Sequence, residues 1–480
     1  MVFARRLSLN QPAFRLFAAM VLLAAVGARL SGQEALPAQT REAIDGAVAQ
    51  VLKRSGAPSA SVAVVKDGRI VFTQAYGLSR IDPARAATPQ MRYAIGSISK
   101  QFTAAAVLLL AEEGRLSLDD KVGKWLPTLT RANEVSIRQL LSMTAGYQDD
   151  WPQDYMLPQM SEPVKPAQIL ELWAQKPLDF EPGTKWQYSN TNYVVAGLIV
   201  EKVSGMGLME FLHKRILDPL RMSSVYDVDR AALPGEDAQR YLRYALGPPR
   251  PAPKEAAGWI YAMGELAMTA HDLALWDISM IDQTILKPDS YRIMWSETHL
   301  ADGSGTGYGL GVHVGNTDGH RSIFHDGEIV GFTAQNTVYP DARAAVVVLC
   351  NLDGTSAPGD IADEIAPLVL PARTSQPSQR PPAAAVEMAR NIFASLQQGK
   401  IDRNLLSPNC KAHFTEQALK DFADSLGPLG TPESFTGSRQ SLRGGMIYRS
   451  YRIRFKDKTL LASTFTLRDG KIEQYMVQEE

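Results

Sequence analysis

Apolar residues recur along this chain with two different periods, which mark out regions of helix and of strand. Residues 40–56 place apolar side chains at helical spacing and end at Gly56, so a helix is predicted there. Residues 61–65 and 69–77 are strand-like runs rich in β-branched and aromatic side chains. The Asp-Gly pair at 67–68 between them is typical of a tight turn, so the two strands are expected to form a β-hairpin.

The chain is mainly helical in its middle, and strand signals return toward residue 370. Helices are predicted over 136–141 and 191–202, whereas 228–257, rich in Pro, Arg and Ala, is expected to be an irregular surface excursion. Four later strands and a closing helix are expected at 308–314, 323–325, 333–339, 344–350 and, for the helix, 360–370. The pattern predicts an α+β fold of the α/β sandwich type, with one antiparallel sheet flanked by helices and a mainly helical region inserted into it.

The composition changes sharply after residue 370. Residues 371–385 are rich in Pro, Ser and Gln and predict a linker. Residues 386–480 are expected to form a separate small α+β domain, large enough to fold alone. The order of its elements resembles the cystatin-like α+β domains, and its role is left open between regulation, oligomerisation and substrate gating. Its predicted helices and strands are 386–397, 415–426, 448–455, 459–467 and 472–477.

The first residues have the pattern of a secretory signal peptide. Arg5, Arg6 and Arg15 precede the apolar run 16–28, which is short for a helix that spans a bilayer. Residues 1–32 are therefore predicted to direct export to the periplasm or the outside of the cell, with an uncleaved membrane anchor as the alternative. No later stretch is long and apolar enough to span a bilayer, so no membrane span is expected in the mature chain.

Composition and charge narrow the function classes. The chain has 480 residues, with 50 basic and 51 acidic side chains, and this near-balance gives no indication of a nucleic-acid partner. Cys350 lies in a buried-strand run and is expected to be an inert core thiol rather than a partner of Cys410. The seven histidines do not cluster at metal-ligand spacing, and no Gly-rich phosphate loop stands out, so neither a metal nor another cofactor is predicted. His271 and His313 are interpreted as structural.

One short stretch carries candidate chemistry. Ser97 and Lys100 stand three residues apart at the start of a helix, where their side chains lie on one face. The helix continues with the apolar run 104–111, so it is expected in the middle of a domain. Burial disfavours a charged ammonium, which would let the amine act as a base toward the serine hydroxyl. Several aromatic residues could line a cleft beside it, although packing is their commoner role: Tyr76, Tyr147, Trp151 and Tyr155.

Two further motifs follow in order, Tyr188-Ser189-Asn190 and His325-Asp326-Gly327. Ser-x-x-Lys, Tyr-x-Asn and Lys/His-x-Gly in this order resemble the penicillin-recognising serine hydrolases, in their class C β-lactamase, D-alanyl-D-alanine carboxypeptidase and esterase branch. The resemblance covers about residues 40–370 and implies a β-lactamase/transpeptidase-like fold for a hydrolase domain over 33–370. The phrases at 137–146, 180–183 and 308–311 agree with it.

The resemblance implies roles for the motif residues. Ser97 would attack a carbonyl carbon, with the base work shared by Lys100 and Tyr188 in a division that the sequence leaves open. Asn190 would contact the substrate amide or orient the lysine, and Gly327 would let substrate lie against its strand. The backbone N–H groups of Ser97 and Glu328 would hold the oxyanion.

His325 stands where typical β-lactamases have the lysine that holds the antibiotic's carboxylate. A mostly neutral histidine makes a weaker clamp, which favours a D-aminopeptidase, amidase or esterase. A true β-lactamase or D-alanyl-D-alanine carboxypeptidase is the alternative, and a non-catalytic penicillin-binding sensor or binding module is the alternative of another class. The expected partner is a small amide, ester or peptide substrate, whose identity stays open together with the oligomeric state.

Overall fold

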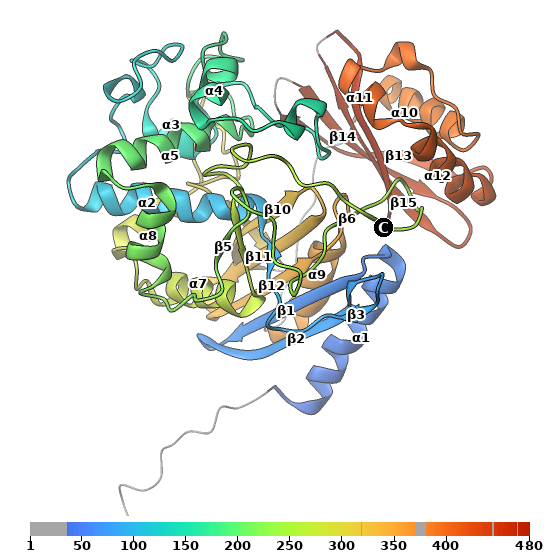
Figure 1. Ribbon diagram of the computed structural model, residues 1–480, viewed down its shortest axis with the longest axis horizontal. Helices are drawn as coiled ribbons and strands as arrows, with labels where there is room; N and C mark the ends of the chain where they lie inside the picture. The colour runs from blue at the N-terminus through green and yellow to red at the C-terminus, as the bar shows by residue number, and fades with distance from the viewer. Residues whose placement is uncertain (1–35, 318, 371–380, 444–445, 468) are drawn as a thin grey trace, which may run out of the picture.

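The computed structural model describes residues 36–317, 319–370, 381–443, 446–467 and 469–480 (Figure 1). The predicted signal peptide at 1–32 and most of the predicted linker lie outside these ranges. Within the described part of the chain, no helix has the length and apolar character needed to cross a membrane.

A seven-stranded antiparallel sheet forms the centre of the larger part, with the order β3-β2-β1-β12-β11-β10-β9. The predicted hairpin is confirmed, since β1 and β2 pair through a turn at Asp67-Gly68. The hairpin joins the late strands through β1 and β12, as the sequence predicted for a single sheet. The strands are β1 (Ser59–Lys66), β2 (Arg69–Arg80), β3 (Arg85–Ala86), β9 (His313–Thr317), β10 (His320–Ile329), β11 (Phe332–Tyr339) and β12 (Ala344–Cys350).

Two predicted strands of the central sheet differ most from the structure. The prediction over 308–314 is wrong for most of its length, because β9 begins only at His313. Gly309 lies against the carbonyl of Met294 and Gly311 has a φ of 75°, so the chain turns here instead of extending. Strand β10 is longer than predicted and carries the whole His325–Gly327 motif inside it.

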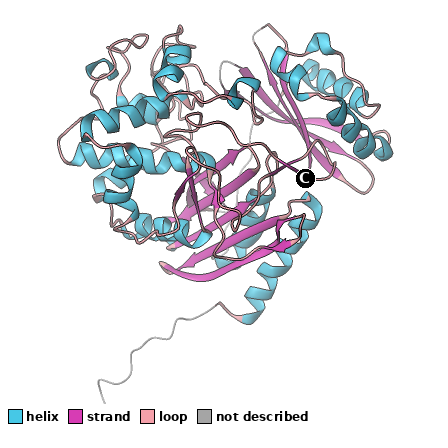
Figure 2. Ribbon diagram, viewed as in Figure 1, coloured by secondary structure: helices cyan, strands magenta, loops and turns pink. Residues whose placement is uncertain are grey.

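Helices cover both faces of the sheet (Figure 2). Side chains alternate along β1, so that Val62 and Val64 pack under helices α1 (Ala38–Ser55) and α9 (Ala357–Val369). Ala63 and Val65 face the opposite side, where α7 (Ala270–Asp282) contacts the sheet and joins it to the large core of the helical region. Runs of buried small and β-branched residues in β1 and β12 fit this burial on both faces.

The helical region contains α2 (Ser99–Glu112), which begins directly after the one-turn helix Gly96–Ile98. Every residue of α2 from Ser99 to Leu110 is buried, as its apolar sequence predicted. The remaining elements here are α3 (Ile137–Leu141), α4 (Pro166–Ile169), α5 (Thr191–Ser204), α6 (Leu208–Leu212), α8 (Pro288–Met294), β4 (Tyr93–Ala94), β5 (Tyr226–Asp227) and β8 (Leu266–Met268).

A separate C-terminal domain has its own four-stranded antiparallel sheet, in the order β13-β14-β15-β16, and its own apolar core. Helix α10 begins at Ala383, three residues before its predicted start, because three alanines after Pro382 favour helix. Strand β13 was not predicted. The elements are α10 (Ala383–Leu396), α11 (Pro408–His413), α12 (Glu416–Leu426), β13 (Ser434–Arg443), β14 (Met446–Arg454), β15 (Thr459–Thr466) and β16 (Ile472–Glu479).

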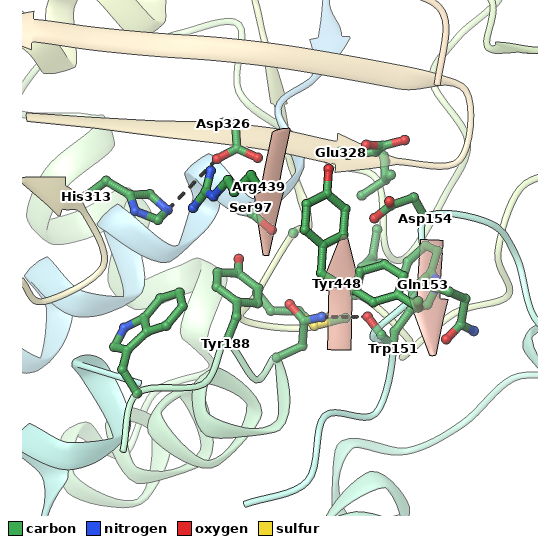
Figure 3. Close-up of a pocket in the computed structure, with 17 residues that line it drawn as sticks. Ser97, Trp151, Gln153, Asp154, Tyr188, His313, Asp326, Glu328, Arg439 and Tyr448 are labelled. Carbon is green, nitrogen blue, oxygen red and sulfur yellow. Dashed lines mark hydrogen bonds and ion pairs between the residues drawn. The ribbon is translucent and has the colours of Figure 1, made fainter. Parts of the chain in front are cut away.

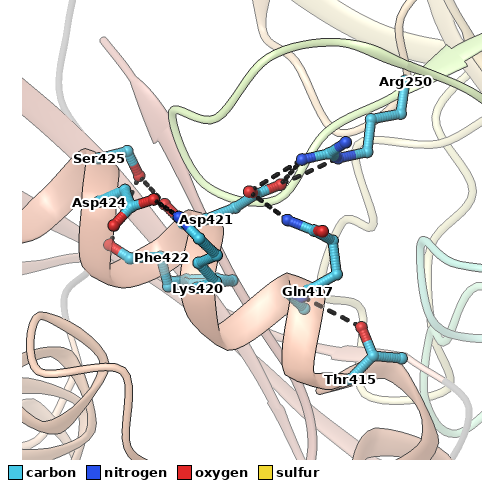
Figure 4. Close-up of polar contacts among 9 residues, drawn as sticks. Arg250, Thr415, Gln417, Lys420, Asp421, Phe422, Asp424 and Ser425 are labelled. Carbon is cyan, nitrogen blue, oxygen red and sulfur yellow. Dashed lines mark hydrogen bonds and ion pairs between the residues drawn. The ribbon is translucent and has the colours of Figure 1, made fainter.

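The excursion at 228–257 holds the two parts together. It forms a small hairpin of β6 (Tyr241–Leu242) and β7 (Arg250–Pro251), and Ala245 at its tip is buried in the C-terminal core. The Arg250 guanidinium donates to both carboxylate oxygens of Asp421 on α12, at 2.8 to 3.0 Å (Figure 4). The excursion is irregular, as predicted, apart from two strands of two residues each, but its tip is not a free surface segment because it docks against the C-terminal domain.

A second contact joins the two domains. Asp154 and Gln474 exchange two hydrogen bonds, with the backbone N–H of Asp154 donating at 2.7 Å and the Gln474 amide donating back at 2.8 Å. Beside them Tyr155 stacks on the ring of His413, with centroids 4.4 Å apart. Cys350 and Cys410 lie in different cores, and both are buried and free.

Candidate active site

Ser97 and Lys100 meet at the junction of the one-turn helix and α2. The Lys100 side chain is fully buried and its Nζ lies 2.9 Å from Ser97 Oγ. Nζ also donates to Asn190 Oδ1 at 2.7 Å and to the carbonyl oxygen of Met263 at 2.9 Å. Those two oxygens can only accept, so they fix two N–H bonds of the amine. The remaining position on the nitrogen points at the serine hydroxyl, where a neutral amine presents its lone pair.

Asn190 orients this lysine. Its Nδ2 donates to the carbonyl oxygen of Trp151 at 3.0 Å, which leaves Oδ1 facing Lys100. The predicted role of Asn190 as the residue that orients the lysine matches this geometry. Asn190 immediately precedes α5, so its position is set by the start of that helix.

Two aspartates that the sequence analysis did not identify hold this helix start. Asp149 Oδ1 accepts the backbone N–H of Asn190 at 2.8 Å, and Asp150 Oδ1 accepts the hydroxyl of Thr191 at 2.9 Å. Burial, together with the neighbouring Asp149 carboxylate, raises the pKa of Asp150. Their signal in the sequence is an Asp-Asp pair before Trp151, which is too common a pattern to identify a site.

Tyr188 lies beside the lysine. The Lys100 Nζ is 5.0 Å from the centroid of the Tyr188 ring, within the range of a cation–π contact. The phenol lines the same cavity as Ser97, and Figure 3 shows its hydroxyl directed toward the side where Ser97 lies. The structure thus brings Ser97, Lys100 and Tyr188, predicted from separate motifs, to one place.

Strand β10 presses against the turn that carries the serine. A Cβ on Gly327 would lie 1.9 Å from the carbonyl oxygen of Ile95, so only glycine fits there. Gly96 has a φ of 51°, and a Cβ on it would lie 2.6 Å from the backbone nitrogen of Glu328. The backbone of Glu328 therefore lies against the turn that ends in Ser97, and its oxyanion role stays a prediction.

His325 is buried beneath the site. Its Nδ1 lies 2.5 Å from the carbonyl oxygen of Asp326, which can only accept, so Nδ1 carries the proton. The Tyr308 hydroxyl then donates to Nε2 at 3.0 Å. Burial, with the nearby ring of His313, lowers the pKa of His325, so the ring is neutral at pH 7. This agrees with the predicted loss of a cationic clamp at this position.

The site opens into a cavity of about 320 Å³ between the two domains (Figure 3). Trp151 lines it, whereas Tyr76 and Tyr147 hydrogen-bond elsewhere and Tyr155 packs at the domain contact. His313, interpreted as structural, also lines it. The cavity walls include Ser97, Trp151, Asp154, Tyr188, Asn190, His313, Asp326, Glu328, Arg439, Tyr448 and Phe465, the last three from the C-terminal domain. No cluster of three or more potential metal ligands occurs among the described residues.

The central sheet, the helical insert and the Ser97–Lys100–Tyr188 site define a protein of the β-lactamase/transpeptidase-like fold class. The comparison with protein families agrees, since the Beta-lactamase family matches residues 44–369. The chain therefore belongs to the Beta-lactamase family.

Relatives are similar at low identity. Protein flp of Staphylococcus aureus is 27% identical over 330 residues, covering 66% of this chain and 64% of its own length. The D-aminopeptidase of Brucella anthropi is 28% identical over 340 residues, covering 66% and 60%. These matches thus span less than two thirds of each relative. Among solved structures, a D-stereospecific amidohydrolase from Streptomyces sp. is 27% identical with a TM-score of 0.57, covering 67% of this chain and 96% of that one.

Proposed function

We propose that this chain is an exported serine hydrolase that cleaves an amide or ester bond through an acyl-enzyme on Ser97. The observation that carries the proposal is the buried Lys100 amine, 2.9 Å from Ser97 Oγ and fixed by two acceptors. A base within hydrogen-bond distance of a nucleophile, itself oriented by a third group, is the arrangement that activates a serine. Export is proposed from the pattern of residues 1–32 alone.

In the acylation step, the Ser97 proton passes to neutral Lys100 as Oγ bonds to the carbonyl carbon. The carbonyl electron pair moves to oxygen, where the N–H groups of Ser97 and Glu328 would stabilise it. When that pair returns, the carbon–nitrogen or carbon–oxygen bond breaks, and the leaving amine or alcohol takes a proton from Lys100 or Tyr188. Water then attacks the ester on Ser97 by the same route and releases the acid.

The proposed substrate is a D-amino-acid amide or peptide, and an ester is an almost equally favoured substrate. Support comes from relatives described as a D-aminopeptidase and a D-stereospecific amidohydrolase. His325 is neutral and buried, so the third motif of the hydrolase domain itself offers no charge to an antibiotic's carboxylate.

Covalent labelling tests the acyl-enzyme. A fluorophosphonate or fluorescent penicillin is expected to modify the native protein and not Ser97→Ala, with the adduct mapped to the peptide that contains residue 97. If neither probe labels the native protein, the acyl-enzyme proposal fails. Hydrolysis of D-amino-acid amides, p-nitrophenyl esters and nitrocefin by the native protein and Ser97→Ala then separates amidase, esterase and β-lactamase. A penicillin adduct that never turns over would indicate a binding or sensor role.

A further inference from the structure

We propose that Arg439 of the C-terminal domain is a specificity-determining residue that binds a carboxylate on the substrate of Ser97. This inference rests on the proposed function and deepens it. It assigns to the C-terminal domain the positive charge that the His325 position of the hydrolase domain lacks.

Arg439 reaches the cavity from β13. It lines the same space as Ser97 and Tyr188, and Figure 3 shows its guanidinium between Asp326 and the serine side of the cavity. The pairing of β13 with β14 shifts register between Gly437 and Arg439, the mark of a β-bulge. Bulges redirect the side chains next to them, which fits an arginine directed at a site rather than along the sheet face.

The carboxylates that line the cavity have donors of their own. Glu328 Oε1 accepts the backbone N–H of Gly354 at 2.7 Å, and Asp154 Oδ2 accepts the Gln474 amide at 2.8 Å. Asp326 lies 4.0 Å from His313 Nε2. Glu328 and Asp154 are therefore engaged in hydrogen bonds within the fold.

The basic side chains of the site differ in their availability to a substrate carboxylate. Lys100 is buried with its N–H bonds directed at Asn190 and the Met263 carbonyl, and His325 is neutral. Arg439 is exposed to the cavity and makes no hydrogen bond or ion pair with another residue that the structure describes. Its planar guanidinium can bind a carboxylate through two parallel N–H bonds, a geometry that a lysine cannot reproduce.

Two contacts hold the C-terminal domain, and with it strand β13, against the hydrolase domain. They are the Arg250–Asp421 pair and the Asp154–Gln474 exchange. The ligand that fits is an acyl compound with a free carboxylate on the far side of the scissile bond, such as a peptide with its own C-terminus.

A matched substrate pair tests this, a D-amino-acid dipeptide with a free C-terminal carboxylate and the same dipeptide as its amide. Hydrolysis is followed at the peptide bond that the two share, because the terminal amide is itself cleavable by an amidase. Arg439→Gln is expected to raise KM for the acid about 10- to 100-fold, the range for a lost charged hydrogen-bond pair, while kcat changes little. The amide should be affected less than about twofold, and Arg439→Lys should restore part of the loss. Arg454→Gln, an exposed arginine of β14 away from the cavity, is the control and should change neither substrate.

Protection of Ser97 from fluorophosphonate by each dipeptide gives a second readout that needs no turnover. Equal losses for acid and amide in Arg439→Gln, or no preference of the native protein for the acid in either readout, would overturn the inference. Labelling of Ser97 in Arg439→Gln is expected to persist, so such a result would leave the proposed function standing. Absence of labelling in the native protein would instead refute the proposed function.

Discussion

Replacing Lys100 with methionine separates the two candidate bases. Lys100 touches Ser97 Oγ directly at 2.9 Å, whereas Tyr188 contacts the lysine through its ring at 5.0 Å. We therefore expect Lys100 to take the serine proton and Tyr188 to assist the leaving group. A general base contributes about 10²- to 10⁴-fold, so Lys100→Met should lower the acylation rate by about 10³-fold, or about 4 kcal/mol of barrier.

The same substitution should leave the fold intact. Methionine has a similar length and no charge, so Asn190 Oδ1 and the Met263 carbonyl each lose a donor, at about 1–3 kcal/mol apiece. Removing a buried amine offsets this cost, because a polar group no longer has to be taken from water. We expect the free energy of unfolding to change by less than about 2 kcal/mol.

The assay is the rate of fluorophosphonate labelling together with thermal unfolding of each variant. Tyr188→Phe is the matched comparison, and it should slow labelling only about 10- to 100-fold, as for loss of a hydrogen bond to a charged group. If Lys100→Met labels within tenfold of the native protein, or Tyr188→Phe is the slower of the two, the assignment of Lys100 as the acylation base is refuted.

Three further substitutions test the surrounding structure. Gly327→Ala should reduce Ser97 labelling at least about 100-fold, because its Cβ would lie 1.9 Å from the Ile95 carbonyl oxygen; labelling at the native rate would contradict this close packing. Arg250→Gln should destabilise the domain contact by about 1–2 kcal/mol in thermal unfolding, because the side chain of Asp421, only 6% exposed, loses its bidentate partner. Lys420→Gln, which removes an exposed ion pair on the same helix, is the control and should have no effect. Asp277 is fully buried, and burial raises its pKa to about 8, against about 3.9 for an unfolded carboxyl. Between pH 4 and 8 the unfolded chain thus releases this proton while the folded protein keeps it, so the free energy of unfolding falls as pH rises. Asp277→Asn should therefore raise the free energy of unfolding by about 3 kcal/mol at pH 7.5 and by much less at pH 4.5. Equal effects at both pH values would contradict a buried, neutral Asp277.

The local patterns predicted the central fold well. The β1–β2 hairpin is specified by an Asp-Gly turn between two apolar runs, and α2 by a run of residues that is apolar all round. The sequence also predicted one antiparallel sheet with this hairpin on its outer side, whereas the pairing of β1 with β12, nearly 300 residues apart, was seen only in the structure. The prediction was wrong over 308–312, where the chain turns and Gly309 and Gly311 lie close to other backbone and side chains.

The site could be predicted where its residues are close in sequence. Ser97 and Lys100 lie within one helical turn, so their spacing already determines that they meet. Asp149 and Asp150 could not be found this way, because their role depends on the loop that brings them to the start of α5. Such contacts between a loop and a helix start about 40 residues later follow no fixed spacing in the sequence.

His325 shows why the charge of this site could not be read from the motifs of one domain. The sequence predicted a neutral histidine and hence a weak hold on carboxylates, and its buried ring is indeed neutral. The opposite wall of the cavity, however, belongs to β13, β14 and β15, and it presents Arg439. The position of this wall depends on the 228–257 hairpin, whose tip docks into the C-terminal core. No local sequence pattern encodes such a contact between apolar residues of two domains. In a cavity shared by two domains, one domain can therefore supply a positive charge that the motifs of the other domain lack. A substitution at Arg439 shows whether this charge binds the substrate, which the hydrolase motifs alone cannot show.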